Sequence, residues 1–133
     1  MTQEEKKLLM KDLCARLPYG VKVNNEIQGD FTVYGICENF IYGRSEVCHI
    51  DFAVEKVKPY LFPLSSITIE QEKELSKLGI SYGEYALHDD IRGLGIMVDD
   101  AYIFFEYCYK HHIDFLGLIK MGLAIDATNL NIY

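Results

Sequence analysis

The chain has 133 residues, half of them apolar and a quarter charged, and its formal net charge is −7. This length is typical of one domain, which predicts a single domain over residues 1–133 that folds without disulfides or a structural metal. Acidic residues are concentrated after residue 66, where eleven Asp and Glu side chains oppose five Lys and Arg side chains. A phosphate backbone would be repelled, so we expect no direct binding of nucleic acid.

The cysteines and the start of the sequence indicate the cellular compartment in which we expect the protein. The four cysteines are far apart, with no C-x-x-C pair, and three of them fall on apolar faces, which favours burial as small apolar side chains. The first residues are charged and amphipathic, unlike a signal peptide, and no apolar run approaches the length of a membrane span. We therefore expect a cytoplasmic protein with free thiols and no membrane association.

The first predicted element is a helix that begins at Thr2 and ends before Pro18. Thr2 and Glu5 fit a capping box, in which each side chain accepts a hydrogen bond from the backbone N–H of the other residue. An apolar stripe follows at helical spacing, formed by Leu9, Met10, Leu13, Cys14 and Leu17. The charged residues are expected mostly on the solvated side: Lys6, Lys7, Lys11, Asp12 and Arg16.

Between residues 19 and 64 the apolar period changes to two, which predicts an antiparallel meander of four or five short strands. The candidate strands read GVKV, FTVYGICE, NFIYGRS and EVCHIDFAV, and turn residues lie between them. The next stretch, VKPYLFPL, contains two prolines. Because proline cannot donate a ladder hydrogen bond, this stretch is predicted to be an edge strand or an extended connector.

Helical signals return after residue 66. Thr68 and Gln71 fit a second capping box, and Gly79 fits the position that follows a helix end. A strongly apolar helix, AYIFFEYCYKHH, is then predicted, with Asp99 or Asp100 as its N-cap. Its apolar side chains fall on two sides, as in a helix that is deeply buried or lies at a subunit interface.

The tail that follows this helix is apolar with two glycines and is predicted to form a short helical turn packed on the body. The elements together predict an α+β fold. In this fold an N-terminal helix and two to three later helices pack on a small antiparallel β-meander.

The sequence HHID at the end of the apolar helix resembles a metal or catalytic site. Adjacent helical side chains point about 100° apart, so one metal ion does not easily bind both His111 and His112. Metal-binding helices use i, i+4 spacing, which is absent here. Positive charge near a helix C-terminus complements the helix dipole. We therefore interpret His111, His112 and Asp114 as a structural helix end.

A second candidate site is the acidic stretch formed by His88, Asp89 and Asp90, with Asp99 and Asp100 ten residues on. Clustered carboxylates suit a magnesium or calcium ion, which leaves a metal-dependent hydrolase as an alternative function. The ligand spacing of an EF-hand is absent. The other interpretation is a solvated loop followed by a helix cap, with no catalytic residue, metal or cofactor.

Four stretches resemble known sequences: LLMKDLCARLPYGVKV (8–23), FTVYGI (31–36), VKPYLFPLSSIT (57–68) and KHHIDFLGLIKMGLAI (110–125). They are similar to a group of short, uncharacterised proteins encoded by phages and mobile elements of gut bacteria. That group often has a basic residue where this chain has Phe62, and an arginine where it has Leu116. The group has no known activity, so the resemblance implies no catalytic residue.

The recurring tail of that group favours a structural role for HHIDFLGLI. In this hypothesis His112 and Asp114 fix the turn of the tail by hydrogen bonds. Three apolar side chains then dock on the body: Phe115, Leu118 and Ile119.

The sequence favours a non-enzymatic accessory protein of phage type that acts by protein–protein contacts, either with a partner or by self-association. The apolar helix, the ten tyrosines and the missing catalytic geometry support this prediction. The candidate interface residues are Ile103, Tyr107, Tyr60 and Phe62. A further alternative is an acidic inhibitor that imitates nucleic acid and blocks a host protein, which requires the second-half carboxylates to gather on one surface.

Overall fold

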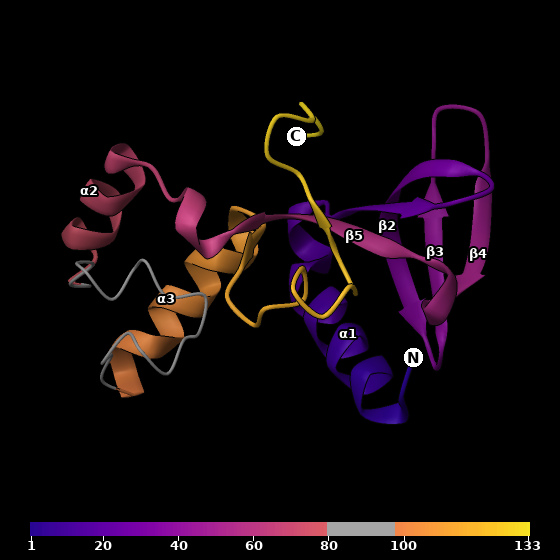
Figure 1. Ribbon diagram of the computed structural model, residues 1–133, viewed down its shortest axis with the longest axis horizontal. Helices are drawn as coiled ribbons and strands as arrows, with labels where there is room; N and C mark the ends of the chain where they lie inside the picture. Colours follow the sequence, from indigo (N-terminus) through magenta and orange to yellow (C-terminus); the bar gives the residue numbers. More distant parts are fainter. Residues whose placement is uncertain (80–97) are drawn as a thin grey trace.

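The computed structural model describes residues 1–79 and 98–133 and has the predicted α+β fold (Figure 1). The helices are α1 (Gln3–Arg16), α2 (Ile69–Lys77) and α3 (Val98–Lys110). The strands are β1 (Lys22–Asn25), β2 (Gly29–Cys37), β3 (Phe40–Arg44), β4 (His49–Ala53), β5 (Lys58–Pro63), β6 (Ile113–Asp114) and β7 (Ile125–Asp126). The 3₁₀ turns are η1 (Leu17–Tyr19), η2 (Val54–Lys56) and η3 (Leu64–Ser66).

Helix α1 begins at the predicted capping box. The Thr2 N–H donates to Glu5 Oε2 at 2.7 Å, and the Glu5 N–H donates to Thr2 Oγ1 at 3.1 Å. Leu9 and Leu13 are fully buried, so the predicted apolar stripe faces a core. The α-helix ends at Arg16, and Pro18 lies in the 3₁₀ turn η1 that follows.

The sheet is larger than the predicted meander and is mixed rather than antiparallel. Its strand order is β4-β3-β2-β1-β5-β6, and β7 also pairs with β5. Neighbouring strands from β4 to β5 are antiparallel, whereas β6 and β7 run parallel to β5. The prediction missed β6 and β7 because each is two residues long, which is too short to show a period.

Strand β5 lies inside the sheet, so the prediction of an edge strand or connector was wrong. Its prolines occupy the second and last positions and leave the peptide groups between them available. The Phe62 N–H donates to the His112 carbonyl at 2.8 Å, and the Leu61 carbonyl accepts from the Ala127 N–H at 2.8 Å. Because the C=O and N–H of one peptide unit point in opposite directions, β6 and β7 lie on opposite edges of β5.

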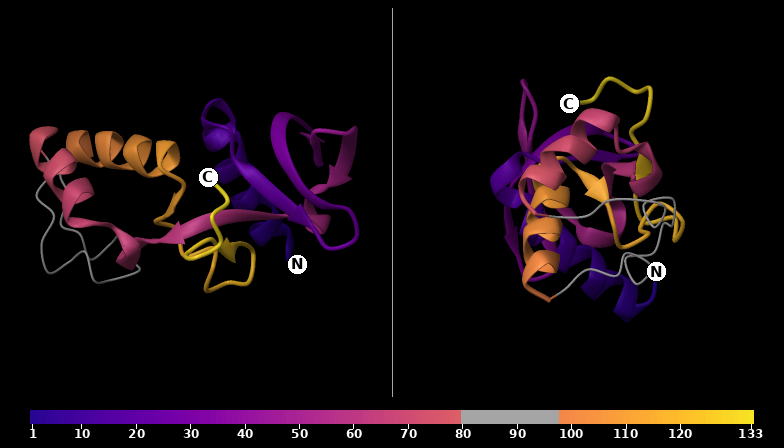
Figure 2. Two further views of the ribbon diagram at one scale, coloured as in Figure 1. Left: turned by 90° about the horizontal axis from the view of Figure 1, so that it is seen from above. Right: turned by 90° about the vertical axis from the view of Figure 1, so that its left-hand side faces the viewer.

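The described residues form two hydrophobic clusters, of which one includes Leu61 of β5 and the other includes Leu64, just after β5. One cluster lies between α1 and the sheet and includes Leu9, Leu13, Val23, Ile41 and Leu61. The other lies around α2 and α3 and includes Leu64, Leu75, Phe104, Tyr107, Cys108 and Phe115. Figures 1 and 2 show α2 and α3 at one end of the molecule, strands β2–β4 at the other, and α1 between them. Leu116 packs against both clusters.

The ends of the later helices match the sequence only in part. The Thr68–Gln71 capping box is present at α2, and Gly79 has a φ of +88° after its end. Helix α3 begins at Val98, so Asp99 and Asp100 lie in its first turn. The prediction that one of them is the N-cap, before the helix, was wrong. The tail contains the predicted turn, in which the Met121 N–H donates to the Gly117 carbonyl at 3.1 Å, and it also contains strand β7, which was not predicted.

The prediction that the cysteines are buried holds only for Cys108. Cys14, Cys37 and Cys48 are exposed. Cys37 is the last residue of β2 and Cys48 precedes β4, so neither lies inside a strand where alternation would bury it.

Candidate functional site

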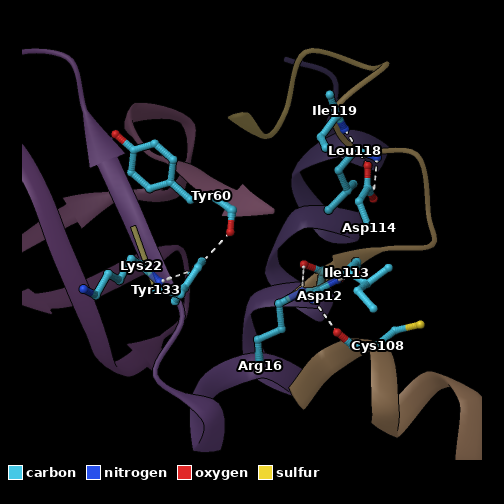
Figure 3. Close-up of polar contacts among 10 residues, drawn as sticks. All are labelled: Asp12, Arg16, Lys22, Tyr60, Cys108, Ile113, Asp114, Leu118, Ile119 and Tyr133. Atoms are coloured by element: carbon cyan, nitrogen blue, oxygen red, sulfur yellow. Dashed lines mark hydrogen bonds and ion pairs between the residues drawn. The ribbon is translucent and has the colours of Figure 1, made fainter. Parts of the chain in front are cut away.

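A buried ion pair fixes α1 against the end of α3 (Figure 3). Asp12 and Arg16 are both completely buried; Arg16 Nε donates to Asp12 Oδ2 at 2.7 Å, and Nη2 donates to Oδ1 at 3.0 Å. The guanidinium also donates to the carbonyls of Cys108 at 3.2 Å and Ile113 at 2.8 Å. A helix leaves its last carbonyls without intrahelical partners, and Arg16 satisfies one of them.

Asp12 and Arg16 were predicted to lie on the solvated side of α1, and this prediction was wrong. Their spacing is i, i+4, which on most helices indicates a surface ion pair. Here the partner carbonyls come from residues more than ninety positions away. No local pattern reveals such a contact.

Next to this ion pair, α1, η1 and α3 form a pocket of about 370 Å³ with a mostly aromatic lining. The lining residues are Ala15, Tyr19, Tyr102, Phe105, Glu106 and Tyr109, and we refer to this site as the aromatic pocket. Tyr102 is 70 % exposed. On α3 the contributing positions are i, i+3, i+4 and i+7, which is one helix face.

Packing beneath the aromatic pocket holds two of its rings, Phe105 and Tyr109. Phe105 stacks on Phe115 with ring centroids 4.8 Å apart and planes at 10°. Tyr109 meets Phe115 edge-on at 5.1 Å, and the Arg16 guanidinium carbon lies 5.2 Å from the centroid of the Tyr109 ring. The buried ion pair therefore supports the pocket directly.

The electrostatic character of the aromatic pocket comes from Glu106. It is exposed and is the only charged residue among the described residues that line the pocket. The Tyr19 hydroxyl donates a long hydrogen bond, 3.5 Å, to Glu106 Oε1. The pocket thus combines aromatic faces, tyrosine hydroxyls and one carboxylate.

The four candidate interface residues lie in different environments. Tyr60 and Tyr107 are each 7 % exposed, which leaves little of either ring for a partner, and Ile103 and Phe62 are half-buried. The Tyr107 hydroxyl donates to Glu74 Oε2 at 2.6 Å. The Tyr60 hydroxyl donates to Asp30 Oδ1 at 2.7 Å, and burial together with this carboxylate raises the pKa of Tyr60 to about 12. Both tyrosines anchor the fold.

His112 lies two residues after α3 and is 8 % exposed, with a left-handed φ of 58°. Its ring stacks on Tyr133, with centroids 3.7 Å apart and planes at 8°. Burial, and then the positive charge of Arg16, lower the pKa of His112 to about 4, so the ring is neutral at pH 7. His112 therefore carries no positive charge that could interact with the dipole of α3, contrary to the prediction.

Asp114 fixes the turn of the tail, as the sequence hypothesis proposed. Its Oδ1 accepts from the Leu118 N–H at 2.9 Å, and its Oδ2 accepts from the Ile119 N–H at 2.8 Å (Figure 3). Phe115 and Leu118 are buried and Ile119 is half-buried. His112 contributes by stacking instead, because its Nδ1 has no hydrogen-bond partner among the described residues.

His111 and His112 also line a pocket of about 390 Å³ with Ser66, Thr68 and Thr128. The Ser66 hydroxyl donates to the Pro63 carbonyl at 2.6 Å, and Thr68 Oγ1 accepts from the Gln71 N–H at 3.2 Å. Both hydroxyls therefore form hydrogen bonds with backbone groups. Within the described part of the chain, no hydroxyl here is paired with a histidine as a nucleophile requires.

The acidic stretch of the hydrolase alternative, His88, Asp89 and Asp90, lies outside the described residues, as do the side chains of Asp99 and Asp100. Across residues 1–79 and 98–133, no described group of three or more His, Cys, Asp or Glu is placed to hold a metal ion. In the same ranges, no helix is long and apolar enough to cross a membrane.

The chain matches no family model, and comparisons with curated proteins and with solved structures also found no match.

Proposed function

We propose that this protein is a non-enzymatic accessory protein of a phage or mobile element that binds another protein through the aromatic pocket. The observation that carries the proposal is a pocket of about 370 Å³ lined by three tyrosines and one phenylalanine, one of them 70 % exposed. Tyrosine and phenylalanine are enriched at the centres of protein interfaces, where they bury a large area. The resemblance of four stretches to phage-encoded proteins supports the biological setting.

Rigidity favours the aromatic pocket as a binding surface. Phe105 is stacked on Phe115, and Tyr109 is held between Phe115 and Arg16. A tyrosine has few rotatable bonds, so it loses little conformational entropy when a partner covers it. Side chains that are already ordered lower the cost of association further.

Affinity capture from a bacterial host lysate with three purified proteins tests the proposal. Wild type and the Tyr34→Ala variant should capture the same protein in stoichiometric amount, and Tyr102→Ala should lose it. Tyr34 is the matched control because it is a 46 % exposed tyrosine on β2. Equal capture by wild type and Tyr102→Ala would show that the partner binds elsewhere.

A second copy of the chain is the simplest alternative partner. Sedimentation equilibrium of the purified protein, measured from micromolar to millimolar concentration, separates the two cases. A wild-type dimer that Tyr102→Ala converts to a monomer would make the aromatic pocket a self-association surface. A monomer at every concentration would leave a different protein as the partner.

A further inference from the structure

The aromatic pocket has the chemistry of a cation site. The face of an aromatic ring carries a negative electrostatic potential, and four rings line this pocket. Glu106 adds a negative charge at the same place, and no described lining residue is positive. The chain as a whole carries a net charge of −7, which attracts cations over a longer range. An anionic partner group would be repelled by each of these features.

We propose that the aromatic pocket receives the side chain of an arginine from the partner protein, an inference that rests on the proposed function. A guanidinium is planar, weakly hydrated and able to stack on aromatic faces while its N–H groups donate to a carboxylate. Glu106 supplies that carboxylate, and the tyrosine rings supply the faces. Arginine is also enriched among the residues that dominate interface energetics.

The protein already contains one arginine bound in this manner. The Arg16 guanidinium makes a two-point contact with Asp12 and lies 5.2 Å from the centre of the Tyr109 ring. Its charge does not oppose a second cation strongly, because Asp12 lies 2.7 Å from it and compensates it. A pocket of about 370 Å³ has room for an arginine side chain.

Lysine fits this site less well. Its ammonium is a compact, strongly hydrated charge that would lose more hydration on entering an aromatic pocket. It also lacks the planar face that stacks on a ring. A purely apolar anchor would fill the rings but leave Glu106 without a partner. An arginine, a lysine and an apolar anchor therefore predict different affinities for small probes that differ in charge and shape.

Titrations followed by two-dimensional NMR test the inference with two near-isosteric probes. N-acetyl-arginine amide carries a guanidinium, whereas N-acetyl-citrulline amide carries a neutral urea in its place. We expect the arginine probe to shift the resonances of Tyr19, Tyr102, Phe105, Glu106 and Tyr109, and to bind roughly five- to thirtyfold more tightly than the citrulline probe. The N-acetyl-lysine amide should bind more weakly than the arginine probe.

The Glu106→Gln variant tests the carboxylate. Glu106 is exposed, so the variant should fold, which unchanged resonances outside the pocket would verify. We expect its affinity for the arginine probe to fall about three- to tenfold and its affinity for the citrulline probe to stay the same. Glu26→Gln is the matched control, because it removes an exposed carboxylate in the turn between β1 and β2.

The outcomes separate this inference from the proposed function. Equal binding of the arginine and citrulline probes, or no shift at the pocket with either, would overturn the arginine site. In both cases the capture experiment with Tyr102→Ala still decides whether the pocket binds a partner. Loss of the arginine preference in Glu106→Gln, together with its retention in Glu26→Gln, would support the inference.

Discussion

Asp12 and Arg16 show how a single pair of residues connects distant parts of the chain. Burial of an ion pair costs desolvation energy, which is recovered only when the geometry is good and the remaining donors are satisfied. Arg16 meets both conditions, since it binds both oxygens of Asp12 and two backbone carbonyls. The pair therefore stabilises one arrangement of α1, α3 and the tail.

Removal of one member of this pair should be strongly destabilising. We expect Asp12→Ala to lower the free energy of unfolding by about 3–5 kcal/mol, because it leaves the buried guanidinium charge uncompensated. Urea denaturation measures this change. The double variant Asp12→Leu with Arg16→Met should recover only part of the loss, because it removes the buried charge but leaves the carbonyls of Cys108 and Ile113 without the Arg16 donors. The control is Glu55→Ala, which removes an exposed ion pair with Lys6 and should change the stability little.

His112 predicts a specific dependence of stability on pH. Its pKa is about 4 in the folded protein, below the ordinary value of 6.5. Above about pH 7.5 the residue is neutral in both states and contributes no pH dependence. Between pH 6.5 and 4 the unfolded chain binds a proton that the folded protein does not, so the free energy of unfolding should fall by up to about 1.4 kcal/mol per pH unit.

Denaturation at a series of pH values, with two variants, isolates this contribution. His112→Asn should lose the extra slope between pH 6.5 and 4, whatever its absolute stability, because asparagine does not titrate and tolerates a left-handed φ. His49→Asn changes an exposed histidine on β4 and should retain the slope. An NMR titration in which the His112 ring is protonated at pH 6 would contradict the prediction.

At the scale of elements, the tail is organised by one carboxylate. Asp114 is 4 % exposed and accepts two backbone hydrogen bonds that start the turn between β6 and β7. We expect Asp114→Ala to cost about 2–4 kcal/mol, since two buried N–H groups lose a charged acceptor. Thermal denaturation tests this. Asp126→Ala is the control because its carboxylate accepts one exposed N–H, from Thr128, and it should cost much less.

The elements that the sequence predicted correctly are those with local signals. Both capping boxes depend on residues three positions apart, and the structure contains both. Strands β6 and β7 carry no such signal, because they exist only where β5 offers them an edge. The aromatic pocket was predictable from the sequence only in part. Tyr102, Phe105, Glu106 and Tyr109 share a predictable helix face, but Tyr19 joins them through the packing of α1 beside α3.

At the scale of the whole molecule, Tyr133 connects the end of the chain to the sheet. Its hydroxyl accepts from the Lys22 N–H at 2.9 Å and donates to the Tyr60 carbonyl at 2.9 Å (Figure 3). Its ring stacks on His112. Burial raises the pKa of Tyr133 to about 12, so the hydroxyl keeps its proton at neutral pH. One side chain thus contacts β1, β5 and the segment that follows α3.

Two substitutions separate the contributions of this side chain. We expect Tyr133→Phe to lower the free energy of unfolding by about 1–3 kcal/mol, because two hydrogen bonds are lost while the stacking remains. Tyr133→Ala should cost more, since it also uncovers His112. Urea denaturation compares the two, and Tyr34→Phe is the control for an exposed hydroxyl. Equal stability of wild type and Tyr133→Ala would show that the end of the chain does not stabilise the fold.

The position of Arg16 also bears on how the protein is made. Its two backbone acceptors lie 92 and 97 residues later in the sequence. A ribosome that adds roughly 5–20 residues per second needs roughly 5–19 s to reach them after Arg16 has been added. During synthesis, α1 therefore emerges long before the partners that hold its charged side chains in the interior. The nascent chain must keep Asp12 and Arg16 hydrated until α3 and the tail arrive, so the final burial of α1 is a late event in biosynthesis.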